Sequence, residues 1–97
     1  MSYVVAATYV SKPDAAGELR EHLTAMIEPT RSEAGCEEST VVNANDDPLT
    51  FLLFEIYRDE EAFQAHAASP HFEEHIRSGA WDLLDSRSVI FGTPLQP

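Results

Sequence analysis

The residues best suited to chemistry lie between Thr50 and Phe72, where the sequence reads TFLLFEIYRDEEAFQAHAASPHF. Glu55 stands in the middle of an apolar run, and a carboxylate buried without partners is so unfavourable that it must be paired, protonated or placed at a cavity. His66 and His71 follow a few residues later. An imidazole exchanges its proton near neutral pH, which suits removal of a proton from a phenol or an enol. We therefore predict Glu55 and His66 as the catalytic residues of a small pocket.

Each of these residues also has a purely structural interpretation. Glu55 can be an acid or base with a shifted pKa, or the group that orients His66, or it can be fixed by an ion pair with Arg31 or a histidine. His66 can equally be a core histidine that is hydrogen-bonded to a backbone carbonyl or to Glu55. We expect Arg31 to pair with Glu33, with Glu55 or with a partner subunit rather than to hold a substrate.

Two aromatic residues and the second histidine are the next candidates for the pocket. Tyr57 and Trp81 each carry one polar hydrogen on an apolar body, which suits binding of a flat aromatic ligand. Trp81 has the alternative of filling the core beneath the last helix. His71 directly follows Pro70 at a helix start, so we expect it at the pocket mouth.

A short motif in the same region resembles a zinc-binding pattern. The sequence HFEEH places His71, Glu74 and His75 as H-x-x-E-H, and two histidines four apart on a helix can share a metal ion. No glutamate follows Glu74 to act as a third ligand. We therefore predict no metal at this motif, and we expect His75 to be solvated.

Apolar periodicity and turn residues predict the elements that would position these side chains. Asp59 is expected to cap the helix that carries His66, and Ser69-Pro70 to end that helix. Pro29 should kink or interrupt the first helix. The predicted elements are, in order, strand 3–10, helix 13–33, strand 36–45, strand 49–57, a helix after Asp59, helix 70–84 and strand 88–93.

This β-α-β-β-α-β order is typical of the ferredoxin-like α+β fold, in which helices cover one face of an antiparallel sheet. The 97 residues suit a single domain over residues 1–97.

The strand 49–57 is apolar on both of its faces, which a sheet covered on one side does not require. One face carries Phe51, Leu53, Glu55 and Tyr57, and the other carries Leu52, Phe54 and Ile56. We expect Val4, Val10, Val89 and Phe91 to add to the uncovered face. An exposed apolar patch marks an association surface, so we predict a homodimer formed through the sheet face.

Composition excludes several classes of partner. Six basic and 17 acidic residues give a net charge of −11, which disfavours binding to nucleic acid or to an anionic membrane. Cys36 is the single cysteine, so no disulfide forms within the chain. The opening MSYVVAATYV has no basic segment before its apolar run, so we expect no signal peptide and a cytoplasmic location.

Two stretches of this sequence resemble a known family. They are Arg31-x-Glu33-x-Gly35-Cys36 and Phe51-x-x-Phe54-Glu55-x-Tyr57-x-Asp59-x-x-Ala62-Phe63-x-x-His66-x-x-Ser69-Pro70-His71-Phe72. Together they are similar to the antibiotic biosynthesis monooxygenase family of small dimeric α+β barrel proteins. That family includes quinol monooxygenases, polyketide-tailoring oxygenases, haem-degrading enzymes and a signal-molecule isomerase.

The resemblance implies a pocket between the sheet and the helices, lined by Glu55, Tyr57, His66, His71 and Phe72. It also implies a reaction without metal or flavin, in which a deprotonated substrate reacts with O₂ through its own carbanion. Haem-degrading relatives carry an asparagine on the first strand and a tryptophan where His66 stands here, so haem degradation is not expected. Polyketide-type oxygenases also use a tryptophan near that position, so their particular mechanism is not implied.

The main hypothesis is a cofactor-independent monooxygenase that acts on a small aromatic, quinol or polyketide-like substrate with O₂. His66 would act as the base, oriented by Glu55, while Tyr57, His71, Phe72 and Trp81 would bind the ring. The alternative is a ligand-binding protein or an isomerase of the same fold, in which Glu55, His66 and His71 move protons without oxygen. A purely structural module is a third hypothesis, and it predicts a cavity too small for an aromatic ring.

Overall fold

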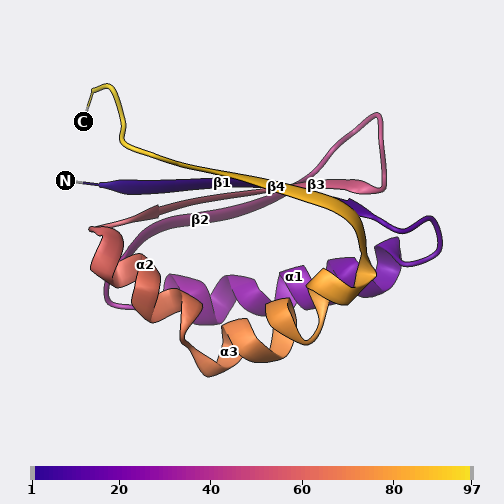
Figure 1. The fold of residues 1–97 in the computed structure, drawn as a ribbon, viewed down its shortest axis with the longest axis horizontal. Helices are drawn as coiled ribbons and strands as arrows, with labels where there is room; N and C mark the ends of the chain where they lie inside the picture. The colour runs from indigo at the N-terminus through magenta and orange to yellow at the C-terminus, as the bar shows by residue number, and fades with distance from the viewer. Residues whose placement is uncertain (1, 97) are drawn as a thin grey trace.

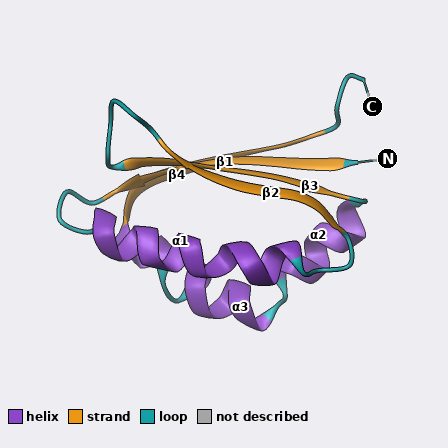
Figure 2. Cartoon of the chain, turned by 180° about the vertical axis from the view of Figure 1, so that it is seen from behind, coloured by secondary structure: helices purple, strands orange, loops and turns teal. Residues whose placement is uncertain are grey.

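A four-stranded antiparallel sheet carries all of the helices on one of its faces (Figures 1 and 2). The computed structural model describes residues 2–96. The strands are β1 (Tyr3–Ser11), β2 (Cys36–Asn43), β3 (Thr50–Tyr57) and β4 (Leu84–Gly92). The helices are α1 (Ala16–Arg31), α2 (Glu60–Ala67), α3 (Pro70–Phe72), the π-helix η1 (Glu73–Arg77) and the 3₁₀-helix η2 (Ala80–Leu83).

The sheet has the strand order β2-β3-β1-β4, and every neighbouring pair is antiparallel. This is the order of the ferredoxin-like fold, and the predicted α+β class is confirmed. Strands β1 and β3 lie in the centre and pair from Tyr3 opposite Tyr57 to Val10 opposite Thr50. These two central strands are each paired on both sides, so the positions of their side chains are fixed by the sheet.

Alternation along β3 separates two environments, as the sequence predicts. Phe51, Leu53, Glu55 and Tyr57 are buried toward the helices. The intervening residues lie on the uncovered face, where Leu52, together with Val42 of β2 and Ile90 of β4, is exposed.

Val89 and Phe91 do not add to the uncovered face, so that part of the prediction is wrong. They pair with Ala7 and Val5, whose side chains are buried on the helix side. One position along a strand decides the face, and both residues consequently line the space between the sheet and the helices.

Helix α1 buries Leu19, Leu23, Met26 and Thr30 against the sheet, which is the expected helical spacing. It is shorter than the predicted span 13–33, since it begins at Ala16 and ends at Arg31. Pro29 does not interrupt it, because it lies in the last turn and the helix continues for two more residues.

Two polar side chains begin the helices that follow β3. The Asp59 carboxylate accepts a hydrogen bond from the backbone N–H of Ala62 at 2.8 Å, which is the predicted cap of α2. The Ser69 hydroxyl accepts one from the backbone N–H of Phe72 at 3.2 Å and starts α3. These caps determine where the turns carrying the histidines begin.

The predicted helix 70–84 is in fact three short segments, and β4 begins at Leu84 rather than at Ser88. Gly79 lies between η1 and η2, at a point that α1 approaches closely. A Cβ atom at this position would lie 2.8 Å from the His22 ring and 2.8 Å from the backbone oxygen of His75.

Within residues 2–96, no helix has both the length and the apolar character needed to cross a membrane.

Candidate active site

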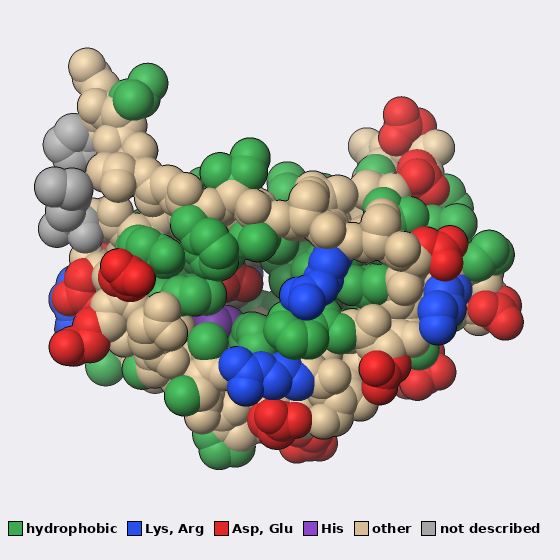
Figure 3. All heavy atoms as spheres, viewed as in Figure 1, with side chains coloured by type: hydrophobic (Ala, Val, Ile, Leu, Met, Phe, Trp, Pro, Cys, Tyr) green, Lys and Arg blue, Asp and Glu red, His purple; other side chains and the backbone are tan. Residues whose placement is uncertain are grey.

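A cavity of about 410 Å³ lies between the sheet and the helices. Figure 3 shows it as a hollow in the face of the molecule, with histidine and acidic atoms visible inside and apolar side chains around them. The volume falls within the range of about 300–1,000 Å³ that is typical of small-molecule sites. The hypothesis of a purely structural module predicted a cavity too small for an aromatic ring, and a cavity of this volume is large enough for one.

Four of the predicted site residues line this cavity: Glu55, His66, Phe72 and Trp81. Strand β3 contributes Glu55, whereas His66 comes from the last turn of α2. Both are buried, with 9% and 2% of their surfaces exposed. Most of the other lining residues are apolar, among them Val5, Ala7, Leu23, Met26, Ile27, Val41, Leu53, Phe63 and Ile76. The two titratable groups therefore face a largely apolar space.

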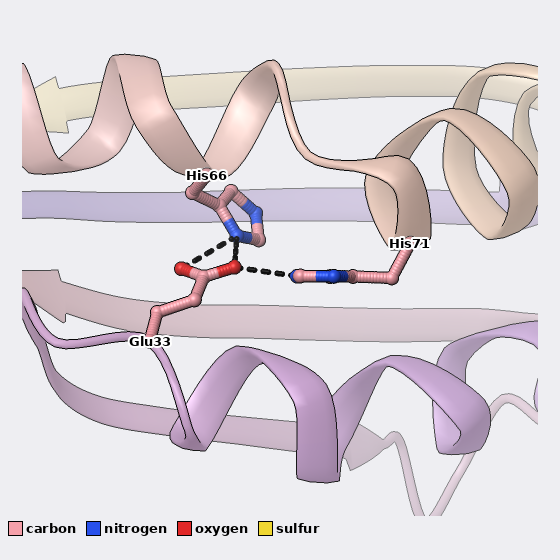
Figure 4. Close-up of side chains that lie close together, drawn as sticks. All are labelled: Glu33, His66 and His71. Atoms are coloured by element: carbon pink, nitrogen blue, oxygen red, sulfur yellow. Dashed lines mark hydrogen bonds and ion pairs between the residues drawn. The ribbon is translucent and has the colours of Figure 1, made fainter.

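The His66 ring is held by Glu33, which lies in the turn between α1 and β2 (Figure 4). Its Nδ1 is 2.9 Å from Oε2 and 3.2 Å from Oε1 of Glu33. An ionised carboxylate only accepts hydrogen bonds, so Nδ1 carries the proton and donates it. A neutral His66 then has its lone pair on Nε2, which lies 3.8 Å from Oε1 of Glu55.

Glu55 has a neighbour on its own strand, because alternate residues share a face. The Tyr57 hydroxyl donates a hydrogen bond of 2.7 Å to Oε1 of Glu55. Burial raises the pKa of the Glu55 carboxyl, although nearby His66 and the Tyr57 hydroxyl oppose the rise. Burial, followed by the charge of Glu55, also raises the pKa of Tyr57. Tyr57 therefore acts here as a donor that fixes Glu55.

Two of the residues predicted to bind substrate do not line the cavity. Tyr57 is fully buried and reaches the site only through Glu55. His71 points from α3 toward Glu33, and its Nε2 lies 2.5 Å from Oε2 of that residue (Figure 4). His71 thus supports the carboxylate that holds His66.

Glu33 is the site residue that the sequence reasoning missed. It was considered only as a partner of Arg31, although it belongs to the motif Arg31-x-Glu33-x-Gly35-Cys36 that resembles the family. Arg31 in fact donates from Nε and Nη2 to the backbone oxygen of Ser39, at 3.0 and 2.8 Å. Its expected pairing with Glu33 or Glu55 within the chain is therefore wrong.

The other end of the cavity has a different chemistry. The Trp81 indole donates a hydrogen bond of 3.1 Å to the Tyr9 hydroxyl. The Arg87 guanidinium lies over the Trp81 ring, with its Cζ 3.7 Å from the ring centroid. All three residues line the cavity, so it has a carboxylate and an imidazole at one end and a cation at the other.

Three of these groups could hold a metal ion by their chemistry, since one ligand atom each from Glu33, His66 and His71 lies within 4.8 Å of the others. The distances between these atoms do not fit a shared metal ion, however. Oε2 of Glu33 lies 2.9 Å from Nδ1 of His66 and 2.5 Å from Nε2 of His71. Ligand atoms bound at about 2.1 Å to one metal lie roughly 3 Å or more from each other. The arrangement is that of a carboxylate shared by two N–H donors.

The H-x-x-E-H residues are not brought together. His75 faces His22 of α1, with 3.2 Å between their Nδ1 atoms, while His71 faces Glu33.

Comparisons with known proteins agree with this architecture. The sequence profile described as antibiotic biosynthesis monooxygenase matches residues 2–78. A curated protein of Mycobacterium tuberculosis, "Putative monooxygenase Rv0793", is 41% identical over 80 residues, covering 82% of this chain and 77% of its own.

Solved structures show the same fold over nearly the whole chain. The structure of Rv0793 has a TM-score of 0.92 at 35% identity and covers 100% of this chain and 98% of its own. The structure of PA3566 from Pseudomonas aeruginosa has a TM-score of 0.91 at 28% identity and covers 97% and 94%. With the profile and the relatives in agreement, the chain belongs to the antibiotic biosynthesis monooxygenase family.

Proposed function

We propose that this protein is a monooxygenase that oxidises a small aromatic or quinol-like substrate with O₂ and needs no cofactor. The observation that supports the proposal most is the orientation of His66. Its Nδ1–H is bound by Glu33, so a neutral ring presents the Nε2 lone pair beside Glu55 in a cavity with room for an aromatic ring. That is the geometry of a general base.

The proposed reaction begins with transfer of the substrate's hydroxyl or activated C–H proton to Nε2 of His66. The resulting carbanion then adds O₂, and the proton held by His66 returns to the peroxide anion. The hydroperoxide R₂CH–OOH loses water to leave a carbonyl, so that R₂CH₂ + O₂ gives R₂C=O + H₂O. The substrate supplies all four electrons that reduce O₂. The apolar lining favours a substrate ring and O₂ over water.

Glu55 is proposed to stabilise the charge that develops on the substrate oxygen. Burial raises the pKa of its carboxyl, which favours the protonated form. A protonated carboxyl can donate a hydrogen bond to an oxyanion. Tyr57 donates to the same carboxyl and leaves the second oxygen of Glu55 to face substrate.

The test is O₂ consumption with a panel of quinols and anthrones. Loss of a positioned base lowers the rate of reaction about 10²- to 10⁴-fold, so the rate of O₂ consumption by His66→Ala should fall by a factor of that order. His75→Ala is the matched control, because His75 faces His22 rather than the cavity. Equal oxygen consumption by the wild type and His66→Ala would show that His66 is not the base.

One observation favours a second candidate, an isomerase. Glu55 and His66 lie 3.8 Å apart and face the same cavity, so one could remove a proton and the other could return it elsewhere on the substrate. Activity that is unchanged under anaerobic conditions would support this isomerase and would contradict the monooxygenase.

We also propose that the protein is a homodimer in which the uncovered sheet faces pack together. Support comes from the exposed apolar residues of that face, Val42, Leu52 and Ile90, which form a patch of the kind that mediates association.

A further inference from the structure

The cationic end of the cavity has no role in the proposed reaction. In the sheet register, Val5 lies opposite Glu55 and Phe91, whereas Tyr9 lies opposite Phe51 and Arg87. The rows that contain Glu55 and Arg87 are therefore four residues apart along β1. At roughly 3.3 Å per residue, this is about 13 Å between backbone positions.

Among residues 2–96, Arg87 differs from the other arginines in having no polar partner. All five arginines lie within residues 2–96. Among those residues, Arg20, Arg31, Arg58 and Arg77 each bind an amide, carbonyl or carboxylate oxygen. Arg87 lies over the face of Trp81, and no carboxylate of residues 2–96 makes an ion pair with it. Stacking on a ring leaves the N–H edge of a guanidinium free.

This free edge is unusual for a protein with 17 acidic and six basic residues. An acidic protein repels anions over long range, so an anionic ligand needs a local cation in order to bind. Arg87 is the basic residue among those that line the cavity. Its planar fork matches a carboxylate through two parallel hydrogen bonds.

We infer that the substrate is a hydroxylated aromatic acid, whose hydroxyl lies near His66 and whose carboxylate binds Arg87. Trp81 holds the guanidinium in place from one side, and the Tyr9 hydroxyl holds the Trp81 indole. The separation of the two rows favours a fused two-ring compound over a single ring. This inference rests on the proposed function, because it assigns the end of the substrate that does not react.

The test measures binding at equilibrium, without turnover. The probes are 6-hydroxy-2-naphthoate, with a hydroxyl and a carboxylate at opposite ends, and 2-naphthol, which lacks the carboxylate. We expect the wild type to bind the acid at least tenfold more tightly than the naphthol. Arg87→Gln should bring the ratio of the two affinities to about one, while Arg87→Lys should keep part of the preference.

Arg58→Gln is the charge-matched control. Arg58 directly follows β3, 3.4 Å from Asp59, and does not line the cavity, so its loss should leave both affinities unchanged. Equal loss of the acid's advantage in Arg58→Gln would indicate a general charge effect and overturn the inference. So would wild-type protein that binds both probes equally or neither of them.

The outcomes separate this inference from the proposed function. If the wild type consumes oxygen with neutral quinols but shows no preference for the acid, the inference fails and the proposed monooxygenase stands. If the wild type clearly prefers the acid but consumes no oxygen, the proposed monooxygenase fails and the carboxylate site at Arg87 stands. If Arg87→Gln instead changes the sedimentation of the protein, Arg87 pairs with a second copy of the chain, and the inference fails.

Discussion

At the scale of single residues, the site depends on a carboxylate that does not touch the cavity. Glu33 accepts hydrogen bonds from both His66 and His71. The Glu33 carboxylate therefore orients the His66 ring, and His71 in turn orients that carboxylate. Buried networks of this kind fix one tautomer, because each nitrogen must have a complementary partner. The tautomer of His66 is thus determined by a residue in the turn between α1 and β2.

Replacing Glu33 with glutamine should therefore disable His66 without removing it. An amide can donate as well as accept, so the proton can move to Nε2 of His66 and the base is lost. We expect oxygen consumption to fall on the order of 10²-fold or more, together with a changed ¹⁵N NMR signature of the His66 tautomer. Glu74→Gln, at an exposed neighbour of His75, should change neither. A Glu33→Gln variant with an unaltered tautomer would contradict this role.

Glu55 leads to a prediction about stability and pH. Burial raises the pKa of its carboxyl. The protonated carboxyl therefore contributes to the free energy of unfolding fully below the unfolded-state pKa, and this contribution is lost as the pH rises through the folded-state pKa. Glu55→Gln does not titrate and can still accept the Tyr57 O–H. We expect the variant to be more stable than the wild type at pH 8, by a margin that shrinks toward pH 4.5. Urea denaturation at both values measures this, and a margin independent of pH would contradict it.

The sequence was informative about residues that follow a regular pattern and uninformative about those in turns. Glu55 and His66 could be placed facing inward because a strand and a capped helix have fixed periods. Glu33 could not, since the direction of a side chain in a turn depends on how α1 and β2 pack. The orientation of His71 was missed for the same reason, because it depends on the distance between α3 and that turn.

At the scale of elements, the strands were predicted to within a few residues and the segment 70–84 was not. Alternating apolar residues give β1 and β3 an unambiguous pattern. Between Pro70 and Leu84 the apolar residues also fit a helix. The segment is nevertheless divided near Gly79, where His22 of α1 leaves no room for a side chain, and β4 starts earlier than predicted. Such a contact joins residues far apart in sequence, and no local pattern reports it.

Gly35 has a similar role, and it locates the helix that carries His66. A Cβ atom at Gly35 would lie 2.4 Å from the Cβ of Ala62, so the turn and α2 approach more closely than any other residue allows. We expect Gly35→Ala to destabilise the fold by about 1–3 kcal/mol, the usual effect of overpacking. For a domain of this size that lowers Tm by about 4–8 °C per kcal/mol.

Gly17→Ala is the matched control for this substitution. Gly17 lies in the first turn of α1 with nothing within 4 Å of its Cβ position, so alanine there should raise stability by about 0.5–1 kcal/mol. Thermal unfolding of both variants measures the contrast. Equal effects of the two substitutions would mean that Gly35 is not a packing constraint.

At the scale of the whole molecule, the sheet has one covered and one uncovered face, and the uncovered one is apolar at its centre. Ile90 of β4, Ala6 of β1 and Phe54 of β3 lie side by side in one row across it. In the single chain, 70% of Ile90 is exposed. A carboxylate at this position should consequently leave the folded subunit intact, whereas in a face-to-face dimer it would be buried beside apolar groups or a like charge.

Ile90→Asp should therefore convert a dimer into a folded monomer. Charges placed in an apolar interface cost several kcal/mol, which corresponds to a weakening of association by more than a hundredfold. Analytical ultracentrifugation at micromolar concentration should show the wild type as a dimer and the variant as a monomer with an unchanged circular dichroism spectrum. Leu95→Asp adds the same charge at a fully exposed position outside the sheet, and it should remain a dimer. A monomeric wild type, or a dimeric Ile90→Asp, would show that the uncovered face is not the interface.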